Sequence, residues 1–114
     1  MVGPDIIEVS RIEKLIKDKG DKFLNRIYTQ GEIDYCESKG PNKYQHYAGR
    51  FAAKEAVFKI LSTKQLKFKN IEILNNDDGS PYIKSGGPYD VFQFDISISI
   101  SHIKKYATAV AVMK

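Results

Sequence analysis

The sequence contains a single cysteine, Cys36, among its 114 residues, and this scarcity excludes two kinds of site. One thiol can form neither an intrachain disulfide nor a thiolate cluster around a metal ion. A reducing compartment is therefore the expected environment. Cys36 lies in an apparently helical run between Glu32 and Glu37, where we expect a small packed side chain rather than a nucleophile.

Long apolar runs are also missing from the sequence. No stretch approaches the roughly 18–20 apolar residues that a membrane-spanning helix requires, and no signal peptide is recognisable. We therefore expect no membrane segment. The length predicts a single domain, residues 1–114, with a modest core, and the 42% hydrophobic and 28% charged residues are ordinary for a globular chain.

The charge of the chain is moderately positive. The 18 Lys and Arg residues against 14 Asp and Glu give a net charge of +4. Such an excess suits an anionic partner, which could be a phosphorylated cofactor, an acidic protein or nucleic acid. A lysine-rich proteome would produce the same composition, so both explanations stay open.

The hydrophobic periodicity places helices mainly in the first half of the chain. We expect a strand over 2–9, and then a helix that Ser10 caps with Glu13 and that stops near Gly20. A second helical stripe follows this break. Thr29 with Glu32 forms another capping box, and after a loop at 40–42 the longest helix is expected over 43–61.

The second half of the chain reads as strands separated by turns. The expected strands are 70–75, 81–84, 92–101 and 106–113. Asp77-Asp78-Gly79 and Gly86-Gly87-Pro88 supply turns between them. This order predicts an α+β fold in which first-half helices pack on a mainly antiparallel sheet.

Two segments carry side chains suited to a metal and a phosphate. Asp5 follows a glycine at a strand start, where a carboxylate could hold Mg²⁺ or simply be a solvated turn residue. Helical spacing places Glu55 and Lys59 on one face, and Arg50 and Lys54 on another. Ordinary surface ion pairs would explain that spacing alone. The same helix also contains small residues that would let a backbone or a ligand approach closely: Gly49, Ala52, Ala53 and Ala56.

Two further segments lie in the strand-rich half. Gly79-Ser80-Pro81-Tyr82 reads as a turn that enters a strand. In the run 96–102, three isoleucines alternate with three serines, which predicts one core face and one polar face. His102 ends this strand, where it would be accessible to a phosphate or serve only a structural role.

In their order and combined content, these segments resemble the bacterial-type holo-acyl-carrier-protein synthases, which are small phosphopantetheinyl transferases. The resemblance covers nearly the whole chain, and its most specific part is the arginine-to-glutamate stretch. It rests on Gly3-x-Asp5-Ile6-Ile7-Glu8, Gly49-Arg50-Phe51-Ala52-Ala53-Lys54-Glu55-Ala56, Gly79-x-Pro81-Tyr82, and Ser99-Ile100-Ser101-His102 with Tyr106-Ala107.

The resemblance implies an enzyme that moves the 4′-phosphopantetheine group of coenzyme A to a serine of apo-acyl carrier protein, in support of fatty acid synthesis. Adenosine 3′,5′-bisphosphate leaves. The family also implies a homotrimer with active sites between subunits, no membrane and no nucleic acid. A bacterial cytoplasm is the family's usual location. The abrupt start at Met1 would equally suit the processed form of an organelle protein whose leader was removed.

The resemblance also assigns roles to residues. Asp5 and Glu55 would coordinate Mg²⁺, and Lys59 would contact the phosphate under attack. Either a water on the metal or Glu55 would accept the serine proton. The coenzyme A-binding set implied by the family is Arg50, Lys54, Lys59, Thr63, Gly79, Pro81, Ser101 and His102. The basic residues implied to dock the carrier protein are Arg11, Lys22 and Arg26.

Two departures from the family pattern keep alternatives open. Ser62-Thr63-Lys64-Gln65 stands where family members carry a Gly-Thr-Gly-type stretch, and Pro4 removes an N–H beside Asp5. A relative that binds coenzyme A without transferring its arm would fit these changes. A basic nucleic-acid-binding module, with Phe92-Gln93-Phe94 as a stacking pair, is the other alternative, although it leaves Asp5 and Glu55 without a role.

Overall fold

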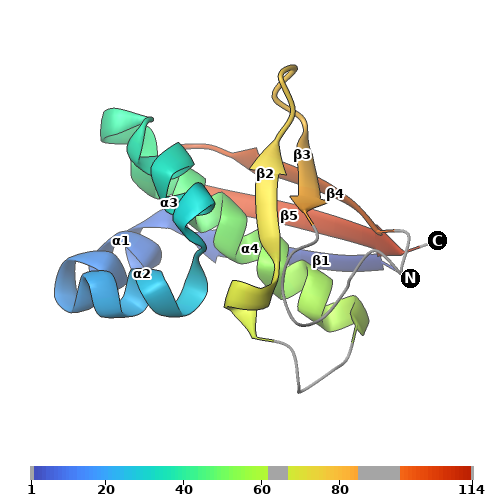
Figure 1. Ribbon diagram of the computed structural model, residues 1–114, viewed down its shortest axis with the longest axis horizontal. Helices are drawn as coiled ribbons and strands as arrows, with labels where there is room; N and C mark the ends of the chain where they lie inside the picture. Colours follow the sequence, from blue (N-terminus) through green and yellow to red (C-terminus); the bar gives the residue numbers. More distant parts are fainter. Residues whose placement is uncertain (1, 62–66, 85–95, 114) are drawn as a thin grey trace.

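The computed structural model describes residues 2–61, 67–84 and 96–113 (Figure 1). Helices fill the first half of the chain and strands the second, as predicted. In chain order the elements are β1 (Val2–Glu8), α1 (Val9–Lys19), α2 (Asp21–Ile27), α3 (Gln30–Glu37), the 3₁₀ turn η1 (Gly40–Asn42), α4 (Lys43–Leu61), the 3₁₀ turn η2 (Phe68–Asn70), β2 (Glu72–Asn75), β3 (Pro81–Lys84), β4 (Ile96–His102) and β5 (Tyr106–Met113).

The strands form two antiparallel sheets. In the larger sheet β5 is central and pairs with β1 on one side and β4 on the other. Ala109 of β5 therefore lies between Asp5 and Ile100. Strands β2 and β3 form a separate hairpin that stands beside α4 in Figure 1. The α+β prediction is confirmed. Among the helices of the described ranges, none is long and apolar enough to cross a membrane.

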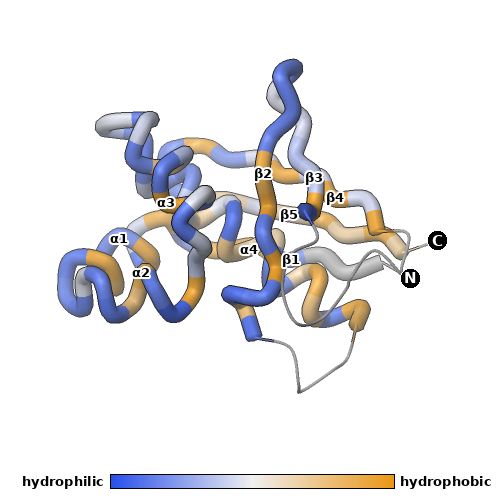
Figure 2. Tube along the Cα trace, in the orientation of Figure 1, coloured by the Kyte–Doolittle hydropathy of each residue, from blue (hydrophilic) through white to orange (hydrophobic). Residues whose placement is uncertain are grey.

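The alternation of β4 has the outcome that the sequence predicted. Its isoleucines are half-buried and pack against the core, whereas its serines are exposed. Strand β5 alternates in the same way, with buried alanines between residues of the outer face. In Figure 2 hydrophobic colour runs along β5 and α4, and the tip of the β2–β3 hairpin is hydrophilic. The core therefore lies between α4 and the larger sheet.

Helix α4 can lie close to the sheet because its inward face is built from small residues. Gly49 gives the clearest measure: a Cβ atom at this position would lie 2.9 Å from Cγ2 of Ile100 in β4. No real Cβ contact is that short, so even a methyl group would force a shift. The small residues of this helix were predicted to let a backbone or a ligand approach closely. In the structure it is the sheet that approaches them.

The capping predictions have mixed outcomes. The box at Thr29 is confirmed, since its backbone N–H donates to Glu32 Oε1 at 2.8 Å and its hydroxyl accepts from the Glu32 N–H at 3.2 Å. The prediction for Ser10 is wrong. The chain passes directly from β1 into α1, so Val9 already begins the helix and Glu8 is the N-cap. The break at Gly20 is confirmed, with a positive φ of 57°.

Several predicted boundaries also differ from the structure. Helix α4 has the predicted bounds, but the expected loop at 40–42 is a 3₁₀ turn. Strand β2 begins at Glu72 rather than at 70, because η2 occupies 68–70. The predicted turn at 86–88 and the positions 92–95 of the fourth strand lie outside the described residues.

A buried ion pair joins the helices to the hairpin. Lys54 Nζ donates to Glu32 Oε1 at 2.6 Å, to the Ile27 carbonyl at 2.8 Å and to the Phe68 carbonyl at 3.0 Å. Glu32 in turn accepts from the Ile73 N–H at 2.8 Å. Both side chains are 0% exposed. Burial lowers the pKa of Lys54, and the Glu32 carboxylate acts in the opposite direction.

We expect Lys54→Met to destabilise the fold by about 3–5 kcal/mol, because it leaves the Glu32 carboxylate buried without its counter-charge. Urea denaturation measures the loss. Lys17→Met is the matched control, since the exposed pair of Lys17 with Glu13 should leave the midpoint nearly unchanged. A Lys54→Met protein as stable as the parent would contradict a structural role for the buried pair.

Candidate functional site

Two carboxylates and a lysine meet where β1 packs against α4. Lys59 Nζ lies 2.9 Å from Asp5 Oδ1, although 54 residues separate them in sequence. Glu55 lies within electrostatic reach of both. Burial and the nearby Asp5 carboxylate raise the pKa of Glu55, while Lys59 and Arg11 lower it. We call Asp5, Glu55 and Lys59 the acidic cluster.

The donor set of the acidic cluster fits a hard cation. Nowhere in 2–61, 67–84 or 96–113 do three or more His, Cys, Asp or Glu side chains gather in a way that could hold a metal ion. A closed structural zinc site would require such a group. Mg²⁺, in contrast, is commonly held by one or two carboxylates and takes its other oxygen ligands from water and substrate phosphates. Asp5 and Glu55 meet that requirement.

A second cluster surrounds Arg50, which is only 3% exposed. Its Nη2 donates to Asn75 Oδ1, and its guanidinium carbon lies 4.0 Å from the centroid of the Tyr35 ring. Its Nε is buried without a hydrogen-bond partner. No carboxylate in the described part of the chain forms an ion pair with Arg50. A buried cation without a counter-ion is costly, so the arrangement indicates a binding site for an anion.

Arg50 opens onto a pocket of about 130 Å³, which we call the arginine pocket. His102 reaches it from the end of β4, and His46 from α4. Their ring centroids are 4.6 Å apart. Burial is the main cause that lowers the pKa of each histidine, and the charge of Arg50 lowers both further. The pKa of His46 falls to about 4. The pocket is lined by Tyr35, His46, Gly49, Arg50, Asn75, Gly79, Pro81, Ile100 and His102.

Most of the predicted site residues that the structure describes fall into these two clusters. The acidic cluster unites the predicted metal ligands with Lys59. The arginine pocket unites Arg50 and His102 with Gly79 and Pro81 of the hairpin turn. Thr63 lies outside the described residues. Ser101 is exposed and does not line the arginine pocket, since it points away from the face that its neighbour Ile100 presents.

The prediction that Lys54 binds the cofactor is wrong. Its ammonium group has three hydrogen-bond partners inside the protein and no exposed surface, so it has no donor to offer a ligand. Helical spacing placed Lys54 one turn from Arg50, but both side chains are buried rather than forming a surface pair.

Four residues around Arg50 and His102 were missed by sequence reasoning. Tyr35 and Asn75 come from α3 and β2, and only the tertiary structure brings them to Arg50. His46 precedes Arg50 by four residues on α4, so helical spacing could have identified it. Gln45 is the fourth, with its Oε1 2.9 Å from His102 Nδ1.

The predicted docking residues are all exposed, and they lie on two helices. Arg11 is in the first turn of α1, whereas Lys22 and Arg26 are in α2, beyond the break at Gly20. Arg11 is near enough to the acidic cluster to lower the pKa of Glu55.

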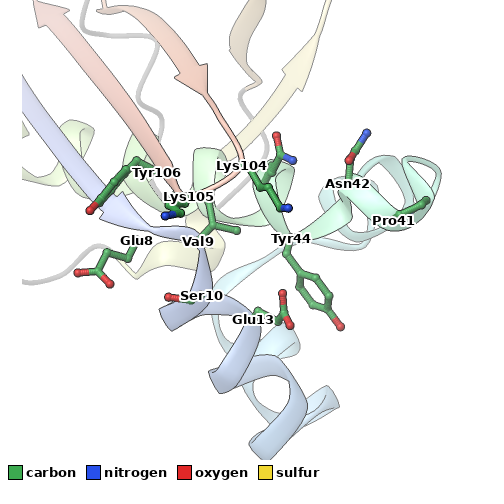
Figure 3. A pocket seen from close by; sticks show the side chains of 11 residues that line it. Glu8, Val9, Ser10, Glu13, Pro41, Asn42, Tyr44, Lys104, Lys105 and Tyr106 are labelled. Carbon is green, nitrogen blue, oxygen red and sulfur yellow. The ribbon is translucent and has the colours of Figure 1, made fainter.

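A further hollow of about 620 Å³ lies between the start of α1, the start of α4 and the turn that joins β4 to β5 (Figure 3). Its charges are mixed, since it is lined by two carboxylates and two lysines: Glu8, Glu13, Lys104 and Lys105. It contains no residue of the acidic cluster. Gln45 borders it and, through its hydrogen bond to His102, separates it from the arginine pocket.

Comparison with known proteins identifies relatives over nearly the full chain. The family model described as the 4'-phosphopantetheinyl transferase superfamily matches residues 1–111. The holo-[acyl-carrier-protein] synthase of Thermodesulfovibrio yellowstonii is 50% identical over 113 residues, which cover 98% of this chain and 96% of that protein. The synthase of Ruminiclostridium cellulolyticum is 46% identical over 121 residues, covering 99% and 90%.

Solved structures agree with these relatives. The Helicobacter pylori holo-[acyl-carrier-protein] synthase in complex with coenzyme A has a TM-score of 0.86 and 37% identity, with 100% of both chains covered. The Bacillus anthracis synthase in complex with CoA (3',5'-ADP) has a TM-score of 0.82 and 39% identity, covering 98% of this chain and 93% of that one. With matches of this extent in both sequence and fold, the chain belongs to the 4'-phosphopantetheinyl transferase superfamily.

Proposed function

We propose that this chain is a holo-acyl-carrier-protein synthase. It transfers the 4′-phosphopantetheine group of coenzyme A to a serine of apo-acyl carrier protein and releases adenosine 3′,5′-bisphosphate, in support of fatty acid synthesis. The observation that carries the proposal is the meeting of Asp5 and Glu55 beside Lys59. The names of the relatives and the coenzyme A complexes of the similar structures support the same reaction.

In the proposed reaction, the serine oxygen attacks the β-phosphorus of coenzyme A, and the bond from that phosphorus to the oxygen of the leaving bisphosphate breaks. Negative charge spreads over the non-bridging oxygens in the transition state. Lys59 can place its ammonium group against that charge. Asp5 and Glu55 would hold Mg²⁺, which when bound neutralises charge on the pyrophosphate.

The serine hydroxyl must lose its proton during the attack. Either Glu55 or a water would accept it, and in the metal-free cluster the pKa of Glu55 lies above its ordinary value. The partly buried setting and the neighbouring Asp5 both act in this direction.

We propose further that the chain acts as a homotrimer with the active site between subunits. The acidic cluster and the arginine pocket share no residue, and Arg50 and Lys59 are nine residues apart on α4, or about 14 Å along the helix. Coenzyme A held at both could then bridge two copies. The exposed apolar side chains Ile6 and Tyr106 on the outer face of the large sheet, 67% and 45% exposed, favour such association.

Carrier-protein docking would use the exposed cations Arg11, Lys22 and Arg26. An acidic partner helix placed over α1 and α2 would lie next to the acidic cluster, because Arg11 acts on Glu55. Charge complementarity of this kind raises the association rate more than the affinity.

A cytoplasmic or organelle location and a single domain remain predictions.

Glu55→Gln should abolish transfer, because it removes one of two metal-binding charges at nearly constant shape. Mass spectrometry of apo-carrier protein incubated with the variant, coenzyme A and Mg²⁺ would show no added phosphopantetheine. Asp34→Asn, an exposed carboxylate on α3, should transfer like the parent chain. A Glu55→Gln protein with near-normal transfer would remove Glu55 from the mechanism, and a parent chain that binds coenzyme A without transfer would establish the inactive alternative.

Arg11→Glu should raise the KM for the carrier protein by roughly tenfold at low salt, with coenzyme A binding intact, because it reverses a charge at the docking surface. Raising the salt concentration should shrink the difference between variant and parent. Steady-state kinetics against carrier concentration measures this, and an unchanged KM at low salt would refute docking at Arg11.

Asp5→Asn should lower the pKa of Glu55, since the Asp5 carboxylate is one of the causes that raise it. Titration of the Glu55 side-chain carboxyl carbon by NMR, without metal, follows the change directly. Asp34→Asn again serves as the control and should leave the titration of Glu55 in place. If Asp5→Asn also left it unmoved, the two carboxylates would not share a site.

A further inference from the structure

The arginine pocket holds His102 in one defined orientation. Gln45 Oε1 lies 2.9 Å from Nδ1 of His102, so Nδ1 carries the proton and donates to the amide oxygen. A ligand inside the pocket would therefore meet the other ring nitrogen, Nε2. The His46 ring packs against the same imidazole and is itself held edge-on by Tyr35, with ring centroids 5.6 Å apart.

The charged and titratable groups around His102 favour its neutral form in the ligand-free pocket. Arg50 approaches from α4, the Tyr35 ring of α3 lies beyond His46, and Lys39 acts on His46 from the turn after α3. Each of the charged groups is a cation. Burial and Arg50 lower the pKa of His102, and the described residues supply no carboxylate that acts in the opposite direction.

A phosphate monoester would change this balance. It brings negative charge next to Arg50, whose Nε is buried without a partner. An imidazolium at His102 could then donate from both nitrogens at once, from Nδ1 to Gln45 and from Nε2 to a phosphate oxygen. Gln45 suits either state of the ring, because its amide oxygen accepts the Nδ1 proton whether or not Nε2 is protonated.

We propose that Gln45 is a positioning residue that aims Nε2 of His102 into the arginine pocket, so that binding of a phosphate monoester is coupled to the uptake of one proton from solvent by His102. The proposal rests on the proposed function, since it takes the nucleotide phosphates of coenzyme A as the ligand. The proposal gives a role to Gln45, which does not touch the ligand. It also couples the uptake of one proton to the binding step rather than to the transfer step.

Isothermal titration calorimetry with adenosine 3′,5′-bisphosphate tests the coupling. At about pH 7.5 the ligand's phosphates are already mostly dianionic, because their second pKa is near 6. Titrations in buffers of different ionisation enthalpy then report the protons taken up by the protein. The parent chain should take up roughly one proton on binding.

Two substitutions at Gln45 separate positioning from packing. Gln45→Leu keeps the size but removes the acceptor, so the bisphosphate should bind about tenfold more weakly and the uptake should fall towards zero. Gln45→Glu restores an acceptor and adds a negative charge that raises the pKa of His102 before binding. The Gln45→Glu protein should bind the bisphosphate more tightly than the Gln45→Leu protein does. It should nevertheless take up fewer protons on binding than the parent chain. Because Gln45 borders the hollow of about 620 Å³, both substituted side chains have room.

His46→Phe identifies the proton acceptor. The phenyl ring keeps the packing against His102, so the uptake should persist. Loss of the uptake in this variant would assign the proton to His46 and overturn the proposal. A Gln45→Leu protein that binds and takes up the proton like the parent chain would overturn it too.

The failure of the inference and that of the proposed function are distinguishable. Tight binding of the bisphosphate by the parent chain without proton uptake would overturn the inference alone. Absence of bisphosphate binding would overturn both, because no nucleotide phosphate would then occupy the arginine pocket.

Discussion

The buried ion pair between Lys54 and Glu32 is the interaction on which the arrangement of the site depends. Successive residues of an α-helix are rotated by about 100°, so fixing one side chain fixes the direction of its neighbours. With Lys54 held among α2, α3 and η2, Glu55 turns towards β1 and Arg50 towards the hairpin. The positions of both clusters thus depend on Lys54, which belongs to neither of them.

Lys54 and Arg50 also show two ways of burying a positive charge on one helix. The charge of Lys54 is matched by a carboxylate and two carbonyls, and it is complete without a ligand. The charge of Arg50 is met by an amide oxygen and an aromatic face, neither of which carries a full negative charge. This difference favours Arg50 over Lys54 as the cation that binds an anionic ligand, whereas Lys54 stabilises the fold.

The sequence predicted those features whose cause is local. Helix α4 has the bounds that its uninterrupted apolar pattern indicated, and the serine and isoleucine alternation of β4 gave the correct faces. The capping box at Thr29 was also found from spacing alone. Features that depend on tertiary contacts were not predicted. Nothing in the spacing of Glu32 shows that, besides capping a helix, it neutralises a lysine 22 residues later.

The same distinction applies to the candidate site. The resemblance predicted the charged candidate residues, because their order along the chain is characteristic of the family. These are Asp5, Arg50, Glu55, Lys59 and His102. The neutral partners that orient them were not predicted, since an asparagine in β2 or a glutamine on α4 becomes informative only when its neighbour in space is known.

The absent side chain of Gly49 has a consequence for this geometry. Its α-hydrogen faces Ile100, two residues before the imidazole that ends β4. Because Gly49 also directly precedes Arg50, the close contact between the Gly49 backbone and the Ile100 side chain sets how near the guanidinium lies to the imidazole. The spacing of these two groups in the arginine pocket therefore depends on the smallest residue in the protein, which itself lines that pocket.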